Sequence, residues 1–354
     1  MNFVSDNVAG CAGPILDALL KANEGVEAPY GEDSFTLQLR KKAQEVFECD
    51  LDIFPIATGT AANSVAIAAM TPAWGGVYCH DTAHIHTTEC NAPEFYSNGA
   101  KLLPVSGADY KISSSELTRL LSVAGFGKTN KAQPSVLSLT QPSDYGTVYR
   151  NPYVEQLSAI AKSYGLGVHM DGARFANALA FLGCTPAEAS WKAGVDILTL
   201  GATKNGAMFA EAIIVFNKKY THDLGYLIRR GGHVWSKMRY ASAQLIAYLD
   251  DGYWMSLGRS ANDQAADLAA KLAAYPFVKF LAPVEANILQ VDLPSEIVDE
   301  LQTCGYKFYR RSKTHIRLLC RYDTDTKDID SLVASIGEIF RKLQKEKVLE
   351  SHDA

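Results

Sequence analysis

A lysine and an aspartate each follow a short apolar run in this chain. Lys204 comes after the run 197–200 and a turn of small residues, and Asp171 follows the run 167–170. We expect both runs to be buried parallel strands, whose carboxyl ends meet at one edge of a sheet and form a ligand site. A lysine that forms an imine with an aldehyde, near a carboxylate that keeps a pyridine nitrogen protonated, is typical of a pyridoxal phosphate (PLP) site. The pairing therefore predicts PLP as the cofactor.

A possible phosphate site precedes an Ala-rich segment. Thr58, Gly59 and Thr60 lie directly before this predicted helix. The free N–H groups of a helix N-terminus, together with a hydroxyl, form a natural cradle for a phosphate. The same pattern is also common in ordinary loops, so this assignment depends on the predicted lysine and aspartate. Thr203 precedes Lys204 in its turn and is a further candidate for cofactor binding.

Two arginines are candidates for binding an anion. Arg174 follows Asp171 by three residues, and its planar fork suits the phenolate oxygen of PLP or a substrate carboxylate. Arg317 lies within the predicted strand 314–319, where an arginine among apolar residues requires an anion. We expect Arg317 to bind the substrate carboxylate, and a surface charge on an edge strand is the alternative.

His84 and His86 lie close together in another polar segment. One of them can stack on a flat cofactor ring or move protons. Two histidines at this spacing also suggest a metal, but no cysteine or carboxylate at ligand spacing accompanies them. We therefore predict no metal site.

Composition and charge argue against several classes of protein. The chain has 354 residues, a formal net charge of −5, 47% hydrophobic and 21% charged residues. Such a charge argues against nucleic acid or an anionic membrane as a partner. Its seven cysteines include no Cys-x-x-Cys pair, and no apolar run approaches the roughly 20 residues needed to span a bilayer. The N-terminus shows no basic-then-apolar run, so we expect a cytoplasmic protein.

Helices and strands alternate through most of the chain. This order predicts an α/β fold with a mostly parallel sheet covered by helices on both faces. The expected helices and strands are these: helices at 14–22, 34–49, 61–70, 151–164 and 234–250, and strands at 53–57, 77–80, 136–140, 167–171, 196–200 and 212–216.

The pattern changes after about residue 252. A helix at 262–275 is followed by strands at 286–293 and 314–319 and by helices at 295–303 and 329–343. We therefore predict a large cofactor-binding domain over 1–251 and a small α+β domain over 252–354. No linker separates them, so they should pack tightly.

With these residues in view, the chain resembles the low-specificity L-threonine aldolases, which are PLP enzymes of the aspartate aminotransferase fold (fold type I). The resemblance runs almost end to end and implies a large, seven-stranded type of sheet. Its motifs are Ser5-Asp6-Asn7, Tyr30-Gly31-Glu32-Asp33, Thr58-Gly59-Thr60-Ala61-Ala62-Asn63, Ala83-His84-Ile85 with Glu89, His169-Met170-Asp171-Gly172-Ala173-Arg174 and Gly201-Ala202-Thr203-Lys204-Asn205-Gly206.

The resemblance implies a role for each matching residue. Lys204 carries the cofactor, Asp171 pairs with its ring nitrogen and His84 stacks on the ring, while the carboxylate of the amino acid is held by Ser5, Arg174 and Arg317. Members of the family often carry a histidine near the substrate hydroxyl, in a stretch that here reads 140–148 and has none. The group that handles the hydroxyl proton is therefore open between His86, Asp144 and a water bound to the phosphate.

The implied reaction is retro-aldol cleavage of β-hydroxy-α-amino acids, for threonine to glycine and acetaldehyde. Aromatic substrates such as phenylserine, β-elimination or transamination on the same cofactor, and an inert PLP-binding scaffold are the alternatives. A nicotinamide dehydrogenase would need Gly-x-Gly-x-x-Gly after the first strand, which we do not find. The resemblance also implies a homodimer or homotetramer with shared sites. Tyr30, a further candidate for substrate binding, and the basic stretch 229–239 are candidates for reaching across the interface.

Overall fold

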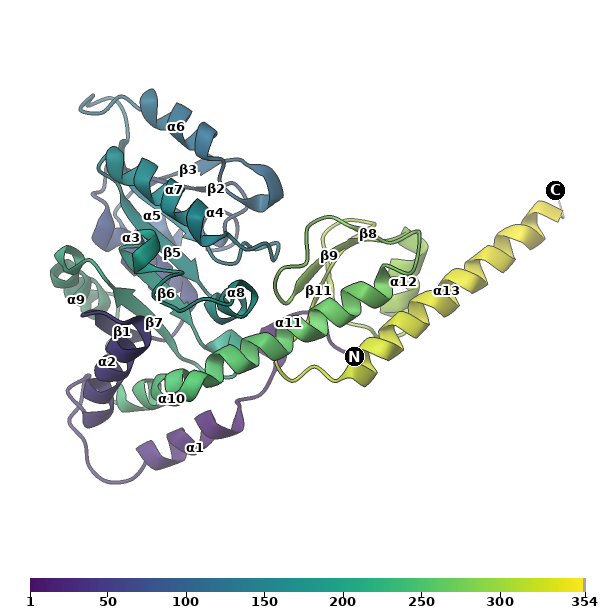
Figure 1. Ribbon diagram of the computed structural model, residues 1–354, viewed down its shortest axis with the longest axis horizontal. Coiled ribbons are helices and arrows are strands. Elements are labelled where there is room, and N and C mark those ends of the chain that lie inside the picture. Colours follow the sequence, from purple (N-terminus) through teal and green to yellow (C-terminus); the bar gives the residue numbers. More distant parts are fainter. Residues whose placement is uncertain (353–354) are drawn as a thin grey trace.

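The computed structural model describes residues 1–352 and contains two sheets that pack against helices (Figure 1). The larger sheet has the order β1-β7-β6-β5-β4-β2-β3, and the smaller has the order β10-β11-β9-β8. The mostly parallel α/β architecture predicted from the sequence is confirmed.

The larger sheet is parallel except for β7, which runs antiparallel to both neighbours. Its inner strands β2, β5, β6 and β7 are buried at every position, because helices cover both faces of the sheet. The bounds are β1 (Asp52–Ile56), β2 (Gly75–His80), β3 (Lys101–Val105), β4 (Gln133–Thr140), β5 (Gly167–Gly172), β6 (Ile197–Gly201) and β7 (Glu211–Val215).

Alternate residues of these strands enter two separate apolar cores. On β6, Leu198 belongs to one core and Ile197 to the other, as a strand period of two requires. The core around Ile197 includes residues of α3 (Gly59–Met70) and α9 (Thr221–Arg230). The opposite core includes residues of α1 (Gly13–Ala22), α2 (Ser34–Phe47), α6 (Ser114–Ser122), α7 (Asn151–Ser163), α8 (Phe175–Leu182) and α10 (Arg239–Leu249). Short helices α4 (His84–Thr87) and α5 (Ala92–Tyr96) lie between β2 and β3 in the chain.

The smaller sheet is antiparallel throughout. It is formed by β8 (Lys279–Phe280), β9 (Ile288–Asp292), β10 (Tyr309–Arg310) and β11 (His315–Leu319), and it packs with α12 (Ser295–Thr303) and α13 (Thr326–His352). The long helix α11 (Tyr253–Leu272) contributes Trp254 to the core of the larger sheet and Leu268 to that of the smaller one. Because α11 joins both cores, the division at residue 252 stays a prediction.

The first residues of the chain also connect the two parts. Phe3 is buried in the core of the smaller sheet, and its N–H donates to the Lys307 carbonyl at 2.8 Å. The Leu319 N–H in turn donates to the Phe3 carbonyl at 3.0 Å. The N-terminal segment therefore runs along the smaller part before it reaches the larger sheet.

Two helices differ from the sequence-based expectation. A single helix over 234–250 was wrong: α9 ends at Arg230, Gly231 and Gly232 follow, and α10 begins only at Arg239. The helix expected from residue 262 already begins at Tyr253. Strand β3 was not expected, because this edge strand is short and carries Pro104.

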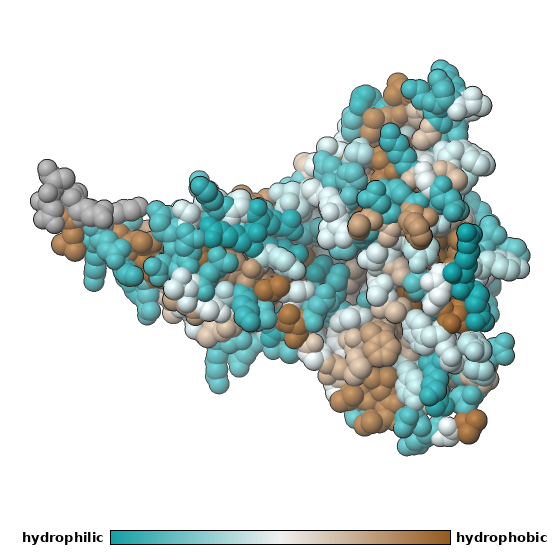
Figure 2. All heavy atoms as spheres, turned by 180° about the vertical axis from the view of Figure 1, so that it is seen from behind, coloured by the Kyte–Doolittle hydropathy of each residue, from teal (hydrophilic) through white to brown (hydrophobic). Residues whose placement is uncertain are grey.

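Hydrophobic side chains gather on one outer surface of the larger part, where α1 lies (Figure 2). Exposed apolar residues in this segment of the chain include Leu16 and Leu20 of α1 and Leu37 of α2, which are 42%, 65% and 61% exposed. Within the described residues, no helix combines the length and the hydrophobicity that crossing a membrane requires.

Candidate active site

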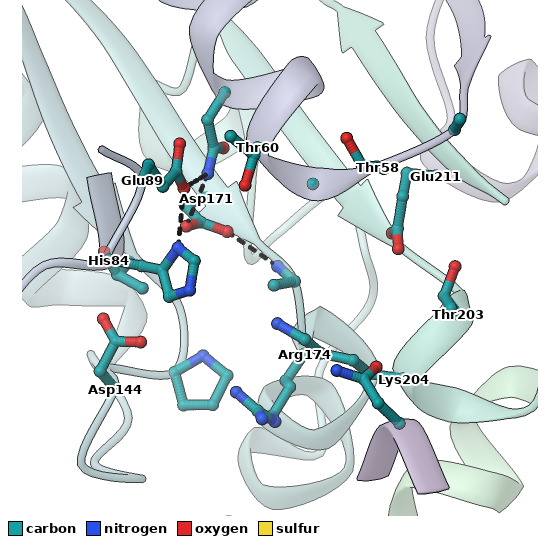
Figure 3. Close-up of a pocket in the computed structure, with 17 residues that line it drawn as sticks. Thr58, Thr60, His84, Glu89, Asp144, Asp171, Arg174, Thr203, Lys204 and Glu211 are labelled. Atoms are coloured by element: carbon teal, nitrogen blue, oxygen red, sulfur yellow. Dashed lines mark hydrogen bonds and ion pairs between the residues drawn. The ribbon is translucent and has the colours of Figure 1, made fainter. Parts of the chain in front are cut away.

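The carboxyl ends of β5 and β6 open into a cavity of about 300 Å³, shown in Figure 3. In the parallel register, Asp171 of β5 lies between Thr140 of β4 and Thr199 of β6. The two strand ends approach closely because residue 201 is glycine: a Cβ there would lie 2.3 Å from the Ala173 carbonyl oxygen. The structure thus brings the predicted aspartate and lysine to one cavity.

Asp171 is a buried carboxylate with neutral partners only. Its Oδ1 accepts from the Ala173 N–H at 3.0 Å, and its Oδ2 accepts from Asn63 Nδ2 at 3.0 Å. The residue is 3% exposed, and no cation forms an ion pair with it in the part of the chain that the structure describes. A buried carboxylate is costly unless a positive group joins it, so this site is suited to a cationic ligand atom.

Lys204 lies in the short 3-10 turn Thr203–Asn205 and lines the same cavity. The neighbouring Asn205 holds the turn in place by donating to the Tyr248 hydroxyl at 3.0 Å and to the Trp254 carbonyl at 2.8 Å. Among the described residues, the Lys204 amine has no hydrogen bond or ion pair. It is therefore available to a ligand.

Helix α3 begins at the edge of the cavity. Thr58 is its N-cap and accepts from the Ala61 N–H at 3.2 Å. Thr58, Gly59 and Thr60 all line the cavity, and nothing lies within 4 Å of the place where a Cβ on Gly59 would stand. The open start of this 12-residue helix therefore has the chemistry of an anion site.

A chain of hydrogen bonds connects His84 to Asp171. His84 Nδ1 lies 2.8 Å from Glu89 Oε1, and Asn63 Nδ2 donates to this same oxygen at 3.0 Å as well as to Asp171. The hydrogen bond that the His84 ring makes to Glu89 is the main cause that raises the pKa of His84, with the charges of Asp144 and Asp171 adding to it. Asn63 and Glu89 stand in the sequence motifs, but local sequence gave no sign of this contact.

Arg174 forms a two-pronged ion pair with Asp6. Its Nε donates to Oδ2 at 2.6 Å and its Nη2 to Oδ1 at 3.1 Å. Burial alone would raise the pKa of Asp6, but the charge and hydrogen bonds of Arg174 hold it below the ordinary value. Part of the Arg174 fork is therefore already occupied, by a residue 168 positions earlier that sequence reasoning had not proposed as its partner.

A second cavity of about 470 Å³ adjoins the first and reaches the smaller part. Ser5 and Arg317 line it. Arg317 donates from Nη2 to the Val4 carbonyl at 2.9 Å and stacks on Tyr309, while its buried Nε has no partner among the described residues. Burial, followed by the charges of Arg174 and Arg311, lowers the pKa of Arg317 to about 10. Such an uncompensated cation is suited to an anion such as a carboxylate.

Two predicted site residues lie elsewhere. His86 is exposed on α4 and lines neither cavity. Tyr30 is 49% exposed, stacks with Arg229 at 5.1 Å and lines neither cavity. The other predicted residues line one or both cavities, namely Ser5, Thr58, Gly59, Thr60, His84, Asp171, Arg174, Thr203, Lys204 and Arg317.

Glu211 is a cavity residue that sequence reasoning missed. It begins β7, is 7% exposed, and accepts from the Ala202 N–H at 3.0 Å. Burial raises its pKa to about 7, although contacts with Thr203, Lys204 and Ala202 oppose that rise. A glutamate at the head of an apolar strand was the only signal for it in the sequence.

These residues fit PLP. The Lys204 amine matches its aldehyde, the carboxylate of Asp171 matches its protonated ring nitrogen, and the start of α3 matches its phosphate. His84 lies on the Asp171 side of the cavity (Figure 3). The donor set therefore offers a complementary group for each polar part of the cofactor.

Comparison with known proteins agrees with a PLP site. The model of the β-eliminating lyase family matches residues 2–294. The low-specificity L-threonine aldolase of Pseudomonas aeruginosa is 39% identical over 94% of this chain and 96% of its own length. That of a Pseudomonas species is 38% identical over 95% and 97%. A solved structure of the Leishmania major threonine aldolase superimposes with a TM-score of 0.89 at 27% identity, covering 96% of this chain and 99% of that chain.

Proposed function

The chain belongs to the β-eliminating lyase family, and from this premise we propose that it is a PLP-dependent lyase that cleaves L-threonine and related β-hydroxy-α-amino acids into glycine and an aldehyde. One observation carries the proposal. The Lys204 amine and the Asp171 carboxylate line one cavity, and within the described residues neither forms an ion pair. The named relatives, which are similar along nearly their whole length, support threonine as a substrate.

Each part of the cofactor would be held by groups already described. Lys204 would bind it covalently, Asp171 would keep its ring nitrogen protonated, and His84 would stack on the ring. The phosphate would lie at Thr58, Gly59 and Thr60, with Thr203 nearby. When bound, PLP supplies an aldehyde for the amine of the amino acid and a protonated ring that accepts electrons from its Cα.

The protein's own contribution is to fix the orientation of the amino acid. Arg317, with Ser5 beside it, offers an uncompensated charge to the α-carboxylate. Arg174 stands between the two cavities, already oriented by Asp6. Because the carboxylate and the amine would be fixed at two points, the direction of the bond between Cα and Cβ would be set as well. Orientation of this kind selects which bond breaks and contributes to rate.

We also propose that the protein forms a homo-oligomer and is located in the cytoplasm. The exposed apolar residues of α1 and α2 favour a homodimer or homotetramer in which this surface is covered. Tyr30 and Arg229, which stack on each other outside the cavities, are suited to a role at such an interface. The seven cysteines are free, which favours a reducing compartment such as the cytoplasm.

The direct test is a product assay. The purified protein with PLP is incubated with L-threonine, and acetaldehyde and glycine are measured beside ammonia and 2-oxobutyrate, the products of elimination. We expect acetaldehyde and glycine in equal amounts, and none from Lys204→Ala. Ammonia as the main product would instead establish an eliminating lyase. Phenylserine, assayed as benzaldehyde, shows whether aromatic substrates are preferred.

A further inference from the structure

The loop after β4 carries an acid whose carboxylate makes no hydrogen bond or ion pair with any residue that the structure describes. Asp144 lies in this loop, and neither of its oxygens has a hydrogen bond or ion pair within the described residues. Its Oδ2 is shielded from solvent, which leaves Oδ1 as the oxygen toward the cavity. Burying a carboxylate oxygen without a hydrogen bond costs folding free energy, and a functional role would explain why the protein keeps it.

The loop holds Asp144 firmly. The Ser143 N–H donates to the Thr147 carbonyl at 2.8 Å, and the two hydroxyls of these residues are 2.7 Å apart. Tyr145 stacks on Tyr110 with ring centroids 3.6 Å apart. The position of the acid is therefore set by the loop itself, as a group that transfers a proton requires.

Of the residues that the structure describes, five line both cavities, and they are Asn7, His84, Asp144, Arg174 and Lys204. Asn7 has no ionisable group, Arg174 stays charged and is bonded to Asp6, and Lys204 is the proposed attachment point of PLP. The remaining two are His84 and Asp144.

His84 is the weaker acceptor of this pair. Its Nδ1 is bonded to Glu89, and the neighbouring carboxylates raise its pKa, which favours the protonated ring that has no free lone pair. Figure 3 shows the Asp144 carboxylate on the same side of the cavity as the His84 ring, across from Lys204 and Arg174. The protonated histidine would thus help to keep Asp144 ionised.

From this arrangement we propose that Asp144 is the base for the β-hydroxyl of the substrate, a role that rests on the proposed aldolase function. The hydroxyl proton passes to the Asp144 carboxylate, and the electron pair of the O–H bond becomes the second bond of the aldehyde C=O. The bond between Cα and Cβ breaks, and its pair stays on Cα until that carbon takes up a proton to give glycine.

Burial and the charges around Asp144 set its pKa, and the pKa sets the pH range in which Asp144 can accept a proton. Burial raises its pKa, and so does the negative charge of Asp171, while His84, Arg174 and Lys204 lower it. The outcome lies above the ordinary value of 3.8. A raised pKa makes the ionised form a better proton acceptor, and activity should fall as the pH drops through this pKa.

The test separates the hydroxyl step from the rest of the chemistry. Asp144→Asn is compared with the wild type in two reactions: cleavage of L-threonine, and exchange of the glycine Cα proton in deuterated water followed by NMR. Exchange requires PLP and the carboxylate site but involves no hydroxyl. Asp81→Asn is the matched control, because Asp81 is an acid that follows β2, outside both cavities.

We expect Asp144→Asn to lower kcat/KM for threonine by about 10²–10⁴-fold. The fall of kcat/KM at low pH that the wild type shows should be absent from the variant. Exchange of the glycine proton should stay near the wild-type rate. Asp81→Asn should retain both reactions. An equal fall of both in Asp144→Asn would overturn the proposal, because the residue would then only shape the site. Cleavage within about tenfold of the wild type would also overturn it and assign the proton to another group, such as a bound water. A wild type that exchanges glycine but cleaves neither threonine nor phenylserine would refute the aldolase function itself.

Discussion

His84 and Glu89 are hydrogen-bonded to each other, with Nδ1 of the ring 2.8 Å from Oε1 of the buried carboxyl group. This contact fixes both the orientation of the ring and the proton on Nδ1. Because Nδ1 is bonded to Glu89, the face of the ring is left to contact a flat ligand. The pair thus links a group at the cavity to the buried side of α3.

Replacing Glu89 by Gln should lower the pKa of His84, because the charged acceptor that favours the imidazolium is removed. NMR titration of the His84 ring in the protein without PLP measures this directly. His222, which is exposed beside Asp223, provides an internal reference in the same spectra. An unchanged His84 titration would contradict the electrostatic role given to Glu89.

Replacing Asp171 by Asn should reduce turnover far more than it reduces PLP content. Asn keeps a side-chain oxygen for hydrogen bonding but has no negative charge to hold a proton on the ring nitrogen. We expect kcat to fall by at least about 100-fold. PLP released from the denatured variant should remain close to one per chain. Equal losses of PLP and activity would indicate that Asp171 only binds the cofactor.

Replacing Arg317 by Leu should raise KM for threonine. The lost charge-assisted bond to the carboxylate is worth about 1.5–3 kcal/mol, or roughly 10- to 150-fold. Steady-state kinetics with threonine measure the change. Lys313→Gln, an exposed change in the same hairpin, is the control and should leave KM unaltered. Should both variants behave like the wild type, the carboxylate would have to bind elsewhere.

Glu211 should make the stability of the protein without PLP depend on pH. Its pKa rises from 4.5 to about 7 in the folded state, so the folded protein holds the proton more tightly than the unfolded chain. The stabilising effect is complete below pH 4.5 and is lost as the pH rises through about 7. Glu211→Gln should therefore lose less unfolding free energy than the wild type between pH 5 and pH 8. The difference should reach about 3 kcal/mol at most.

Urea unfolding of the wild type and the variant at both pH values gives this difference. Glu45→Gln, at an exposed position of α2, should follow the wild type and serves as the control. The idea fails if the wild type and Glu211→Gln lose the same unfolding free energy.

The sequence was most informative where a site residue ends a strand. Lys204 and Asp171 could be placed at one edge because parallel strands bring their carboxyl ends together, whatever the rest of the chain does. The pairing of Arg174 with Asp6 could not be predicted in this way. It depends on how the N-terminal segment crosses the molecule, and no local pattern encodes a contact over 168 positions.

Local patterns were also insufficient for residues whose side chain could point either way. His86 seemed as suitable as His84, but the single turn of α4 directs one residue to the cavity and leaves the other exposed. For Asp144, the composition of the loop was visible in the sequence. That its carboxylate makes no hydrogen bond with another described residue was visible only in three dimensions.

The N-terminal segment has a mechanical consequence. Phe3 is anchored in the smaller part, Val4 accepts a hydrogen bond from Arg317, and Asp6 holds Arg174 of the larger part. Only three peptide bonds therefore separate Phe3, which is buried in the smaller part, from Asp6, which binds Arg174 of the larger part. Any tilt of the smaller part is transmitted to both arginines at once, so the two cannot be repositioned independently.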